Sequence, residues 1–350
     1  MKDFDPNAAS PKDSGIFGLP FTVAEAKLVL LPIPWEATTS YGGGTSLGPQ
    51  AIFNASKQVD LYDYELGNFF TAGIAMADES AEVQKWNHAA RQSALNVIAA
   101  IGSDDLINQQ PAVAAVNNYS EKLNDYVYTE TKNYLSQGKL VGLVGGDHST
   151  PFGAIRAFLE KYPAMGVLHI DAHADMREAY EGFEHSHASI MYNLISKTPL
   201  KKLVQVGIRD FCEEELDFIN QHPDRVKTFF DAPTADQKLE GKSWSTICDE
   251  IVQHLPQLVY ISFDIDGLDP RFCPHTGTPV PGGLEFREAL YLIKKVVQSG
   301  RRIIGFDLNE VSPGTTNHAD SDEADPAAEW DANVGARILY KLCGWTLLSP

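Results

Sequence analysis

The sequence of 350 residues has few cysteines, a shortage of basic residues and no long apolar run. The four cysteines lie far apart, at positions 212, 248, 273 and 343, and form no Cys-x-x-Cys pair. A disulfide scaffold and a zinc knuckle are therefore not expected. We expect a reducing, cytoplasmic environment instead. No window reaches the roughly 18 apolar residues of a membrane span, and the N-terminus lacks the basic start and apolar run of a signal peptide.

The shortage of basic residues limits the partners that the chain could bind. Lys and Arg total 28 against 47 Asp and Glu, which gives a net charge of −19. Such a chain repels the phosphates of nucleic acids and of anionic membranes, so neither is an expected partner. A small cationic molecule fits this charge better. The hydrophobic fraction of 43% is enough for a sizeable core, which excludes a disordered chain.

Short apolar runs alternate along the chain with segments of helical spacing. The apolar runs are hydrophobic at consecutive positions, as in strands that are covered on both faces. Such strands with helices between them predict a three-layer αβα domain of the α/β class, with a mainly parallel central sheet. The predicted strands are residues 27–33, 139–146, 165–170, 203–208, 257–263 and 301–308, and the predicted helices are residues 82–101, 121–137, 151–161 and 327–342.

The predicted domain organisation is simple. No fixed repeat or linker divides the chain, so residues 26–350 are expected to form one domain, preceded by a polar N-terminal arm of residues 1–25. Residues 103–118 are predicted to be an irregular connection between two helices. The acidic run ADSDEAD at 319–325 is typical of a solvated surface turn.

Residues that could carry chemistry follow the predicted strands, at the point where each strand ends. In an open α/β sheet, ligands bind at the carboxyl ends of the strands. Four of the predicted strands are followed there by acidic residues, two of them also by histidine: GGDHS at 145–149, DAHAD at 171–175, DIDGLD at 264–269 and DLNE at 307–310. One such segment alone is often a cap or a turn, but four in one chain favour a functional site.

Six of these side chains form a candidate metal site. Carboxylates at this density repel one another strongly in a partly dry cleft, so a cation is expected among them. Two imidazoles and four carboxylates are too many ligands, and too rich in oxygen, for one tetrahedral zinc. They suit two divalent ions of the manganese type, bridged by shared carboxylates. The six residues are His148, Asp171, His173, Asp175, Asp264 and Asp266.

Together these segments resemble the motifs of the ureohydrolases, the family of arginase, agmatinase, guanidinobutyrase and formimidoylglutamase. The motifs are GGDHS at 145–149, DAHAD at 171–175, SFDIDGLDP at 262–270 and the NE of DLNEVSP at 309–310. The loop PIPWEATTSYGGGTSLGPQAI at 32–52 is similar to the entrance loop of the family. The resemblance implies an arginase-like catalytic domain, a centre of two manganese ions, release of urea from a guanidino compound, and a homotrimer or homohexamer. Nickel is the alternative metal.

The resemblance also implies a role for each site residue. One metal would be held by His148, Asp171, Asp175 and Asp264, and the other by Asp171, His173, Asp264 and Asp266. Asp171 and Asp264 would bridge the two ions. Asp175 and His187 would move protons, and Glu310 would hold the guanidinium by charge-assisted hydrogen bonds. His185, two residues earlier, competes with His187 for this role, although an ordinary surface position is the favoured interpretation of His185.

The residues after the second motif favour an agmatine-type substrate, which would be hydrolysed to urea and putrescine. The segment from Asp175 to Gly182 resembles that of agmatinases, and its Arg177 departs from arginase. Arg177 could instead pair with the carboxylate of a substrate such as guanidinobutyrate or formimidoylglutamate. A structural pairing of Arg177 with Glu178 or Glu181 is the other reading.

The entrance loop leaves a third class of substrate open. Trp35, Thr38 and Thr39 are candidate substrate-binding residues, and this bulky, polar set could close the site over free guanidine, with nickel as the metal. A two-metal phosphoesterase is a remote alternative, in which Arg209 could face the phosphate. A non-catalytic metal-binding subunit is a further alternative, which the intact ligand set disfavours.

Overall fold

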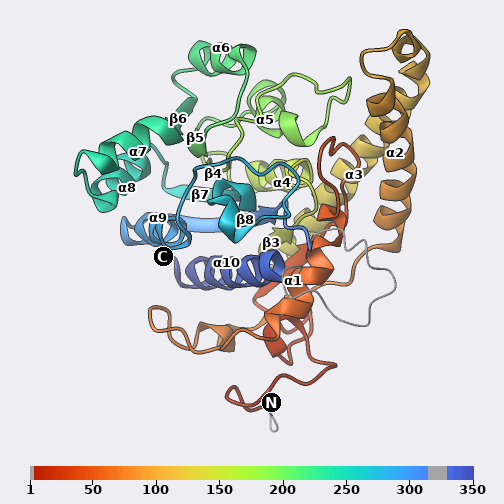
Figure 1. The fold of residues 1–350 in the computed structure, drawn as a ribbon. Helices are drawn as coiled ribbons and strands as arrows, with labels where there is room; N and C mark the ends of the chain where they lie inside the picture. The colour runs from red at the N-terminus through yellow and green to blue at the C-terminus, as the bar shows by residue number, and fades with distance from the viewer. Residues whose placement is uncertain (1–3, 314–328) are drawn as a thin grey trace.

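An eight-stranded parallel sheet is the centre of the computed structural model, which describes residues 4–313 and 329–350 (Figure 1). The spatial order of its strands is β2-β1-β3-β8-β7-β4-β5-β6, and every neighbouring pair is parallel. The strands are β1 Leu28–Pro32, β2 Ile74–Met76, β3 Leu140–Val144, β4 Gly166–Ile170, β5 Leu203–Ile208, β6 Val226–Phe230, β7 Leu258–Asp264 and β8 Arg302–Asn309.

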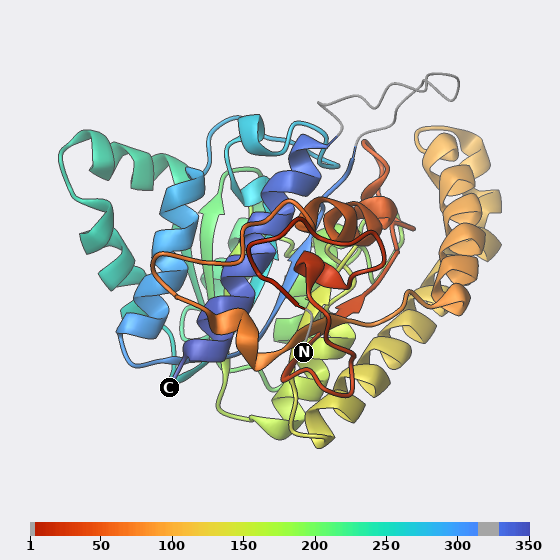
Figure 2. The same ribbon diagram turned by 90° about the horizontal axis from the view of Figure 1, so that it is seen from below.

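Helices cover both faces of this sheet (Figures 1 and 2). One core cluster receives side chains from α1, α8, α9 and α10, and a second cluster, on the other face, receives them from α3, α4 and α5. The predicted three-layer α/β fold is therefore confirmed. The helices are α1 Gly48–Ser56, α2 Ala81–Ala100, α3 Gln110–Ser136, α4 Phe152–Lys161, α5 Ile190–Lys197, α6 Glu213–Gln221, α7 Asp231–Leu239, α8 Trp244–Gln253, α9 Phe286–Gln298 and α10 Trp330–Leu348.

The inner strands are almost completely buried because both of their faces pack against helices. In β4, Val167 belongs to one core cluster and its neighbour Leu168 to the other. All five residues of β4 and all six of β5 are buried. This explains why consecutive hydrophobic positions, and not an alternation with polar ones, identified these strands in the sequence.

Two strands and one helical segment differ from the sequence predictions. The edge strands β2 and β6 were not predicted, because β2 has only three residues and β6 buries only the first of its five. The prediction of an irregular connection at 103–118 was wrong: a 3-10 helix spans Asp104–Gln109 and α3 begins at Gln110. Pro111 lies in the first turn of α3, where proline favours the start of a helix and does not break it.

Part of the N-terminal arm packs into the hydrophobic core. Ile16, Phe17 and Leu19 are buried in the core, and the ring of Phe17 packs edge-on against that of Tyr340 with centroids 4.8 Å apart. The acidic run at 319–325 lies outside the described residues. None of the described helices is both long enough and apolar enough to cross a bilayer.

The turn after β3 requires glycine at position 146. A Cβ added to Gly146 would lie 1.8 Å from the carbonyl oxygen of Trp35, and that oxygen belongs to rigid backbone. We expect Gly146→Ala to lower the free energy of unfolding by about 2 kcal/mol or more, because the two backbone segments must separate. Chemical denaturation measures this value. Gly43→Ala is the control, since its added Cβ would meet no described atom nearer than 4.0 Å, and an equal loss in both variants would contradict the prediction.

Candidate metal centre and catalytic site

Four neighbouring strands deliver the candidate site residues to one place: β3, β4 and β7 the six candidate ligands, and β8 Glu310. β3, β8, β7 and β4 are consecutive in the sheet and parallel, so their carboxyl ends share one edge. The four motif segments begin where these strands end. The site therefore results from the strand order, which brings together segments more than 130 residues apart in the chain.

His148 is the centre of a first group of ligands. Its Nδ1 lies 2.8 Å from Asp171 Oδ2, 3.2 Å from Asp264 Oδ2 and 3.3 Å from Asp175 Oδ2. On the other side of the ring, Nε2 is 2.9 Å from the hydroxyl oxygen of Ser262. A proton on Nε2, donated to Ser262, leaves the lone pair of Nδ1 directed at the carboxylates, as metal binding requires.

His173 belongs to a second group, and Asp171 joins the two. His173 Nδ1 lies 3.1 Å from Asp266 Oδ2 and 3.4 Å from Asp171 Oδ1. Asp171 thus presents Oδ2 to His148 and Oδ1 to His173. Among the described residues, potential ligand atoms of His148, His169, Asp171 and Asp175 lie within 4.8 Å of one another, as do those of Asp171, His173 and Asp266.

Two buried oxygens show that this arrangement fits cations. Asp175 Oδ2 and Asp266 Oδ2 are buried and accept no hydrogen bond from any described residue, although each faces an imidazole nitrogen within 3.3 Å. A buried carboxylate oxygen without a donor is costly unless a cation neutralises it. The shared Asp171 and the two unsatisfied oxygens are what a pair of divalent ions would use.

The charges of the cluster confirm how strongly the carboxylates interact. Burial and the nearby Asp171 raise the pKa of Asp175 to about 7. Burial, Asp266 and Asp171 hold the pKa of Asp264 well above its usual range. The pKa of His148 is raised, because its three carboxylate partners outweigh the effect of burial. Without metal, the cluster therefore retains protons in place of the missing positive charge.

His169 is a site residue that the sequence analysis missed. Its ring is fully buried, its Nε2 lies 2.7 Å from Asp171 Oδ2, and its Nδ1 is 3.1 Å from Gln205 Nε2. It therefore supports the shared carboxylate from behind. The signal was present: position 169 is two residues before Asp171, so the same strand alternation that groups residues 171, 173 and 175 extends to it.

Asp175 and Glu310 both have a left-handed backbone, with φ of 55° and 61°. Such a conformation costs a non-glycine residue roughly 1–2 kcal/mol, so the surrounding structure must enforce it. Glu310 is buried and its Oε1 accepts a hydrogen bond of 2.8 Å from the backbone N–H of His148. Burial and the nearby Asp147 raise its pKa well above the usual range. The carboxylate of Glu310 thus lies directly beside the ligand cluster.

His187 lies on the wall of a cavity of about 240 Å³ next to the cluster. Thr38 contacts it twice, because the threonine hydroxyl oxygen is 3.2 Å from both the backbone nitrogen and the ring Nδ1 of His187. Burial lowers the pKa of His187 to about 3, so its ring is uncharged at neutral pH. His185 lies elsewhere, with its ring against Phe152.

The entrance loop contributes to this cavity through residues that were not singled out. Ser40 and Tyr41 line it, together with His173, Asp175, Arg177 and Asp210. Trp35, Thr38 and Thr39 are buried: Trp35 lies in a hydrophobic cluster with Leu143, and the hydroxyl of Thr39 donates to the carbonyl of Glu36. The structure places these three residues behind the cavity wall.

Arg177 pairs with a residue from a distant helix. Its Nε lies 3.6 Å from Oε2 of Glu215, a buried residue of α6 that also accepts 2.9 Å hydrogen bonds from the backbone N–H groups of Met176 and Cys212. The partner is thus neither Glu178 nor Glu181, as the sequence analysis had considered. Arg177 thus pairs with a glutamate that is near it in the folded chain and not with one of its neighbours in the sequence.

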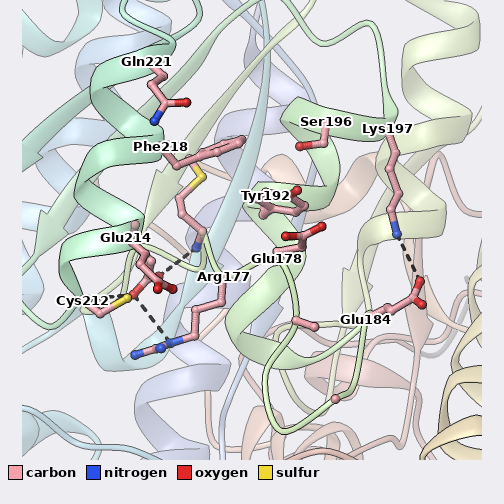
Figure 3. A pocket seen from close by; sticks show the side chains of 14 residues that line it. Arg177, Glu178, Glu184, Tyr192, Ser196, Lys197, Cys212, Glu214, Phe218 and Gln221 are labelled. Carbon is pink, nitrogen blue, oxygen red and sulfur yellow. Dashed lines mark hydrogen bonds and ion pairs between the residues drawn. The ribbon is translucent and has the colours of Figure 1, made fainter.

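Arg177 and Glu215 also separate the 240 Å³ cavity from a larger one of about 950 Å³, since both line the two cavities. Figure 3 shows the larger cavity, with Arg177, Cys212 and Glu214 on one side and Lys197 and Glu184 on the other. Lys197 pairs with Glu184 at 3.8 Å. Glu178 and Glu214 remain as negative charges on its lining without an ion pair among the described residues.

Comparisons with known proteins bear on the family and the fold of the chain. The model of the family described as "Arginase family" matches residues 26–343. The chain is 33% identical over 297 residues to N(1)-aminopropylagmatine ureohydrolase of Synechocystis sp., covering 83% of each chain. It is 30% identical to agmatinase of Cronobacter sakazakii, covering 91% of this chain and 88% of the relative. The solved structure of proclavaminate amidino hydrolase from Streptomyces clavuligerus has the same fold, with a TM-score of 0.71, 24% identity, and coverage of 98% of this chain and 100% of that one.

Metal affinity should depend on pH. The pKa of Asp175 is about 7 without metal, so below pH 7 a cation must displace a proton from this carboxyl group. We expect the affinity for manganese to fall about tenfold per pH unit for each proton released as the pH drops from 7 to 6. Titration calorimetry in two buffers of different ionisation enthalpy measures the affinity and counts the protons. An affinity that is constant over this range, without proton release, would contradict this expectation.

Removal of Asp266 should empty one of two metal sites. Its Oδ2 is the unsatisfied oxygen that faces His173. We expect Asp266→Ala to retain one equivalent of metal after dialysis, where the unchanged chain retains two, because the first group of ligands stays intact. Elemental analysis checks this. Asp269→Ala is the matched control, since its carboxylate accepts from the backbone of Arg271 and belongs to neither group. Two equivalents in Asp266→Ala would show that Asp266 is not a ligand.

Proposed function

This chain belongs to the arginase family of hydrolases that act on the C–N bonds of amidines, and from that premise we propose that its substrate is a linear guanidino amine. Agmatine and its longer aminopropyl derivative are the two candidates, and both would release urea and leave a polyamine. The proposal rests above all on the two groups of ligands that share Asp171 beside an acid-lined cavity. The relatives described above support it by their names alone.

The ligand cluster would hold two divalent cations. His148, Asp171, Asp175 and Asp264 would contact one, and Asp171, His173, Asp264 and Asp266 the other. When bound, such ions supply a nucleophilic water at neutral pH. Oxygen-rich ligands with two imidazoles suit manganese, and nickel is the alternative. In this proposal the fold of residues 26–350 is the catalytic domain, and the assembly is a homotrimer or a homohexamer.

Three residues of the chain would act on the substrate itself. Glu310, whose carboxylate lies beside His148, would hold the guanidinium group by charge-assisted hydrogen bonds. Asp175 lines the cavity and would pass a proton toward the departing amine. His187 would accept and return protons at the cavity wall, where its ring Nδ1 lies 3.2 Å from the hydroxyl oxygen of Thr38.

The charges around the cavity favour an amine over an acid at the far end of the substrate. Arg177 is the positive charge on the cavity lining that could bind a carboxylate, but its guanidinium is paired with Glu215. Asp210 lies on the same wall and is exposed. The lining of the adjoining larger cavity has four glutamates and two cations, and the two cations pair with Glu215 and Glu184, so Glu178 and Glu214 are the excess negative charges. Unneutralised carboxylates attract an ammonium group and repel a carboxylate.

The alternatives receive less support from these contacts. Free guanidine would leave most of the 240 Å³ cavity without a ligand group. A phosphoesterase needs cations that face the phosphate, but the Arg209 side chain donates to the backbone carbonyls of Asp266, Leu268 and Val280. It is therefore committed to the protein backbone.

A panel of guanidino compounds tests the proposal directly. Urea release would be measured with agmatine, N(1)-aminopropylagmatine, arginine, 4-guanidinobutyrate and guanidine, each with manganese and with nickel, and phosphate release with p-nitrophenyl phosphate. We expect kcat/KM for one of the two amines to exceed that for 4-guanidinobutyrate by at least about tenfold, since like charges repel at the cavity. A preference for guanidine or the acid would overturn the substrate class, and phosphate release without urea would overturn the proposed reaction.

A further inference from the structure

The helical hairpin of α2 and α3 lies at one flank of the molecule, beside α4 and next to the loop of residues 36–44 (Figures 1 and 2). It contributes no ligand to the metal centre. Its side chains nevertheless bind both segments of chain that surround His187. The contacts come from polar residues of the hairpin to backbone groups, which fix the position of a loop more firmly than contacts to side chains would.

The first segment is the part of the entrance loop that carries Thr38. Asn87 Oδ1 of α2 accepts a hydrogen bond of 2.8 Å from the backbone N–H of Glu36. One turn later on the same face of α2, Arg91 Nη1 donates to the carbonyl oxygens of Ala37, at 3.4 Å, and of Thr39. Backbone groups on both sides of Thr38 are thus tied to α2. Thr38 in turn contacts the backbone and the ring of His187.

The second segment leads directly into His187. Asn117 of α3 uses both ends of its amide there: Nδ2 donates to the carbonyl of Gly182 at 3.2 Å, and Oδ1 accepts from the backbone N–H of Glu184 at 3.0 Å. Between these two residues, Phe183 is fully buried in a cluster that contains Val97 of α2 and Val116 of α3. The hairpin therefore holds residues 182–184 by two hydrogen bonds and one buried aromatic ring.

Arg91 also acts electrostatically on the second segment. Burial raises the pKa of Glu181, and the positive charge of Arg91 opposes this shift. Glu181 has a left-handed backbone, with φ of 56°, immediately before the segment that Asn117 holds. Arg91 is thus a link between the entrance loop and the turn that precedes His187.

We propose that the α2–α3 hairpin is a positioning element for His187, with Arg91 and Asn117 as its positioning residues. This inference rests on the proposed function, in which His187 moves protons. Proton transfer requires a fixed donor–acceptor geometry, and a displacement of about 1 Å can lower the rate about a hundredfold. Neither residue touches the ligand cluster, so its loss should change the rate of the chemical step and not the binding of metal.

Variants of Arg91 test the proposal through a split between kcat and KM. We expect Arg91→Ala to lower kcat for the preferred guanidino amine at least about tenfold, with KM and metal content within about twofold of the unchanged chain. Arg91→Lys should recover part of the loss, because an ammonium group can still donate to the loop carbonyls. Lys85→Ala is the matched control: it removes the same charge from an exposed position of α2, and its kcat should be unchanged.

A double-mutant cycle separates positioning from general destabilisation. If Arg91 acts through Thr38, the variant Thr38→Val combined with Arg91→Ala should lose no more activity than the more impaired of the two single variants. Asn117→Ala, which changes the other helix, should lower kcat in the same way. If Arg91→Ala does not fold, Asn117→Ala tests the positioning role in its place. Thermal melting checks that each variant is folded at the assay temperature.

The outcomes distinguish this inference from the function on which it rests. Additive losses of activity in the cycle would overturn the positioning role while the proposed reaction stands. The same conclusion would follow if Arg91→Ala and Asn117→Ala both had the kcat of the control Lys85→Ala. Loss of metal in Arg91→Ala would also overturn it, since the hairpin would then support the ligands. If the unchanged chain released no urea from any guanidino compound, the proposed function would fail first.

Discussion

Mutual repulsion among buried carboxylates is the constraint on which the rest of this site depends. Asp171, Asp175, Asp264 and Asp266 meet at one edge of the sheet, where little water can screen them. Folding them together without a cation forces protons onto groups that would otherwise be ionised. The buried oxygens that accept no hydrogen bond from described residues show where positive charge is needed. A pair of divalent ions would neutralise these charges and so remove the repulsion.

Three arginine side chains near this centre are bound to other groups of the protein. Arg177 is paired with Glu215, and Arg209 donates to backbone carbonyls. Arg91 holds the entrance loop. Each guanidinium thus supports the shape of the site, and the negative charges of the cavity lining stay available to a cationic ligand. The net charge of −19 has the same consequence at long range, because it attracts cations toward the mouth of the site.

Much of this could be predicted from the sequence, and the failures have physical causes. The buried strands were found because apolar residues occupy adjacent positions in each of them, whereas β2 and β6 were too short or too exposed to show that pattern. The start of α3 was missed because its first residues were assigned to the irregular connection at 103–118, although Pro111 there is a residue that favours the first turn of a helix. His169 was overlooked because it lies inside an apolar strand, where a single histidine is usually a core residue.

The sequence by itself determined the fold class, the family and the candidate metal-ligating side chains, since these depend on local patterns: consecutive apolar residues, and polar residues placed just after them. Only tertiary structure decided the partner of Arg177, the contacts of Thr38 with His187, the binding of the entrance loop by α2 and the binding of residues 182–184 by α3. Each of these contacts joins residues that are 38 to 149 positions apart. No spacing in the sequence encodes such a contact, because it depends on how separate elements pack across the edge of the sheet.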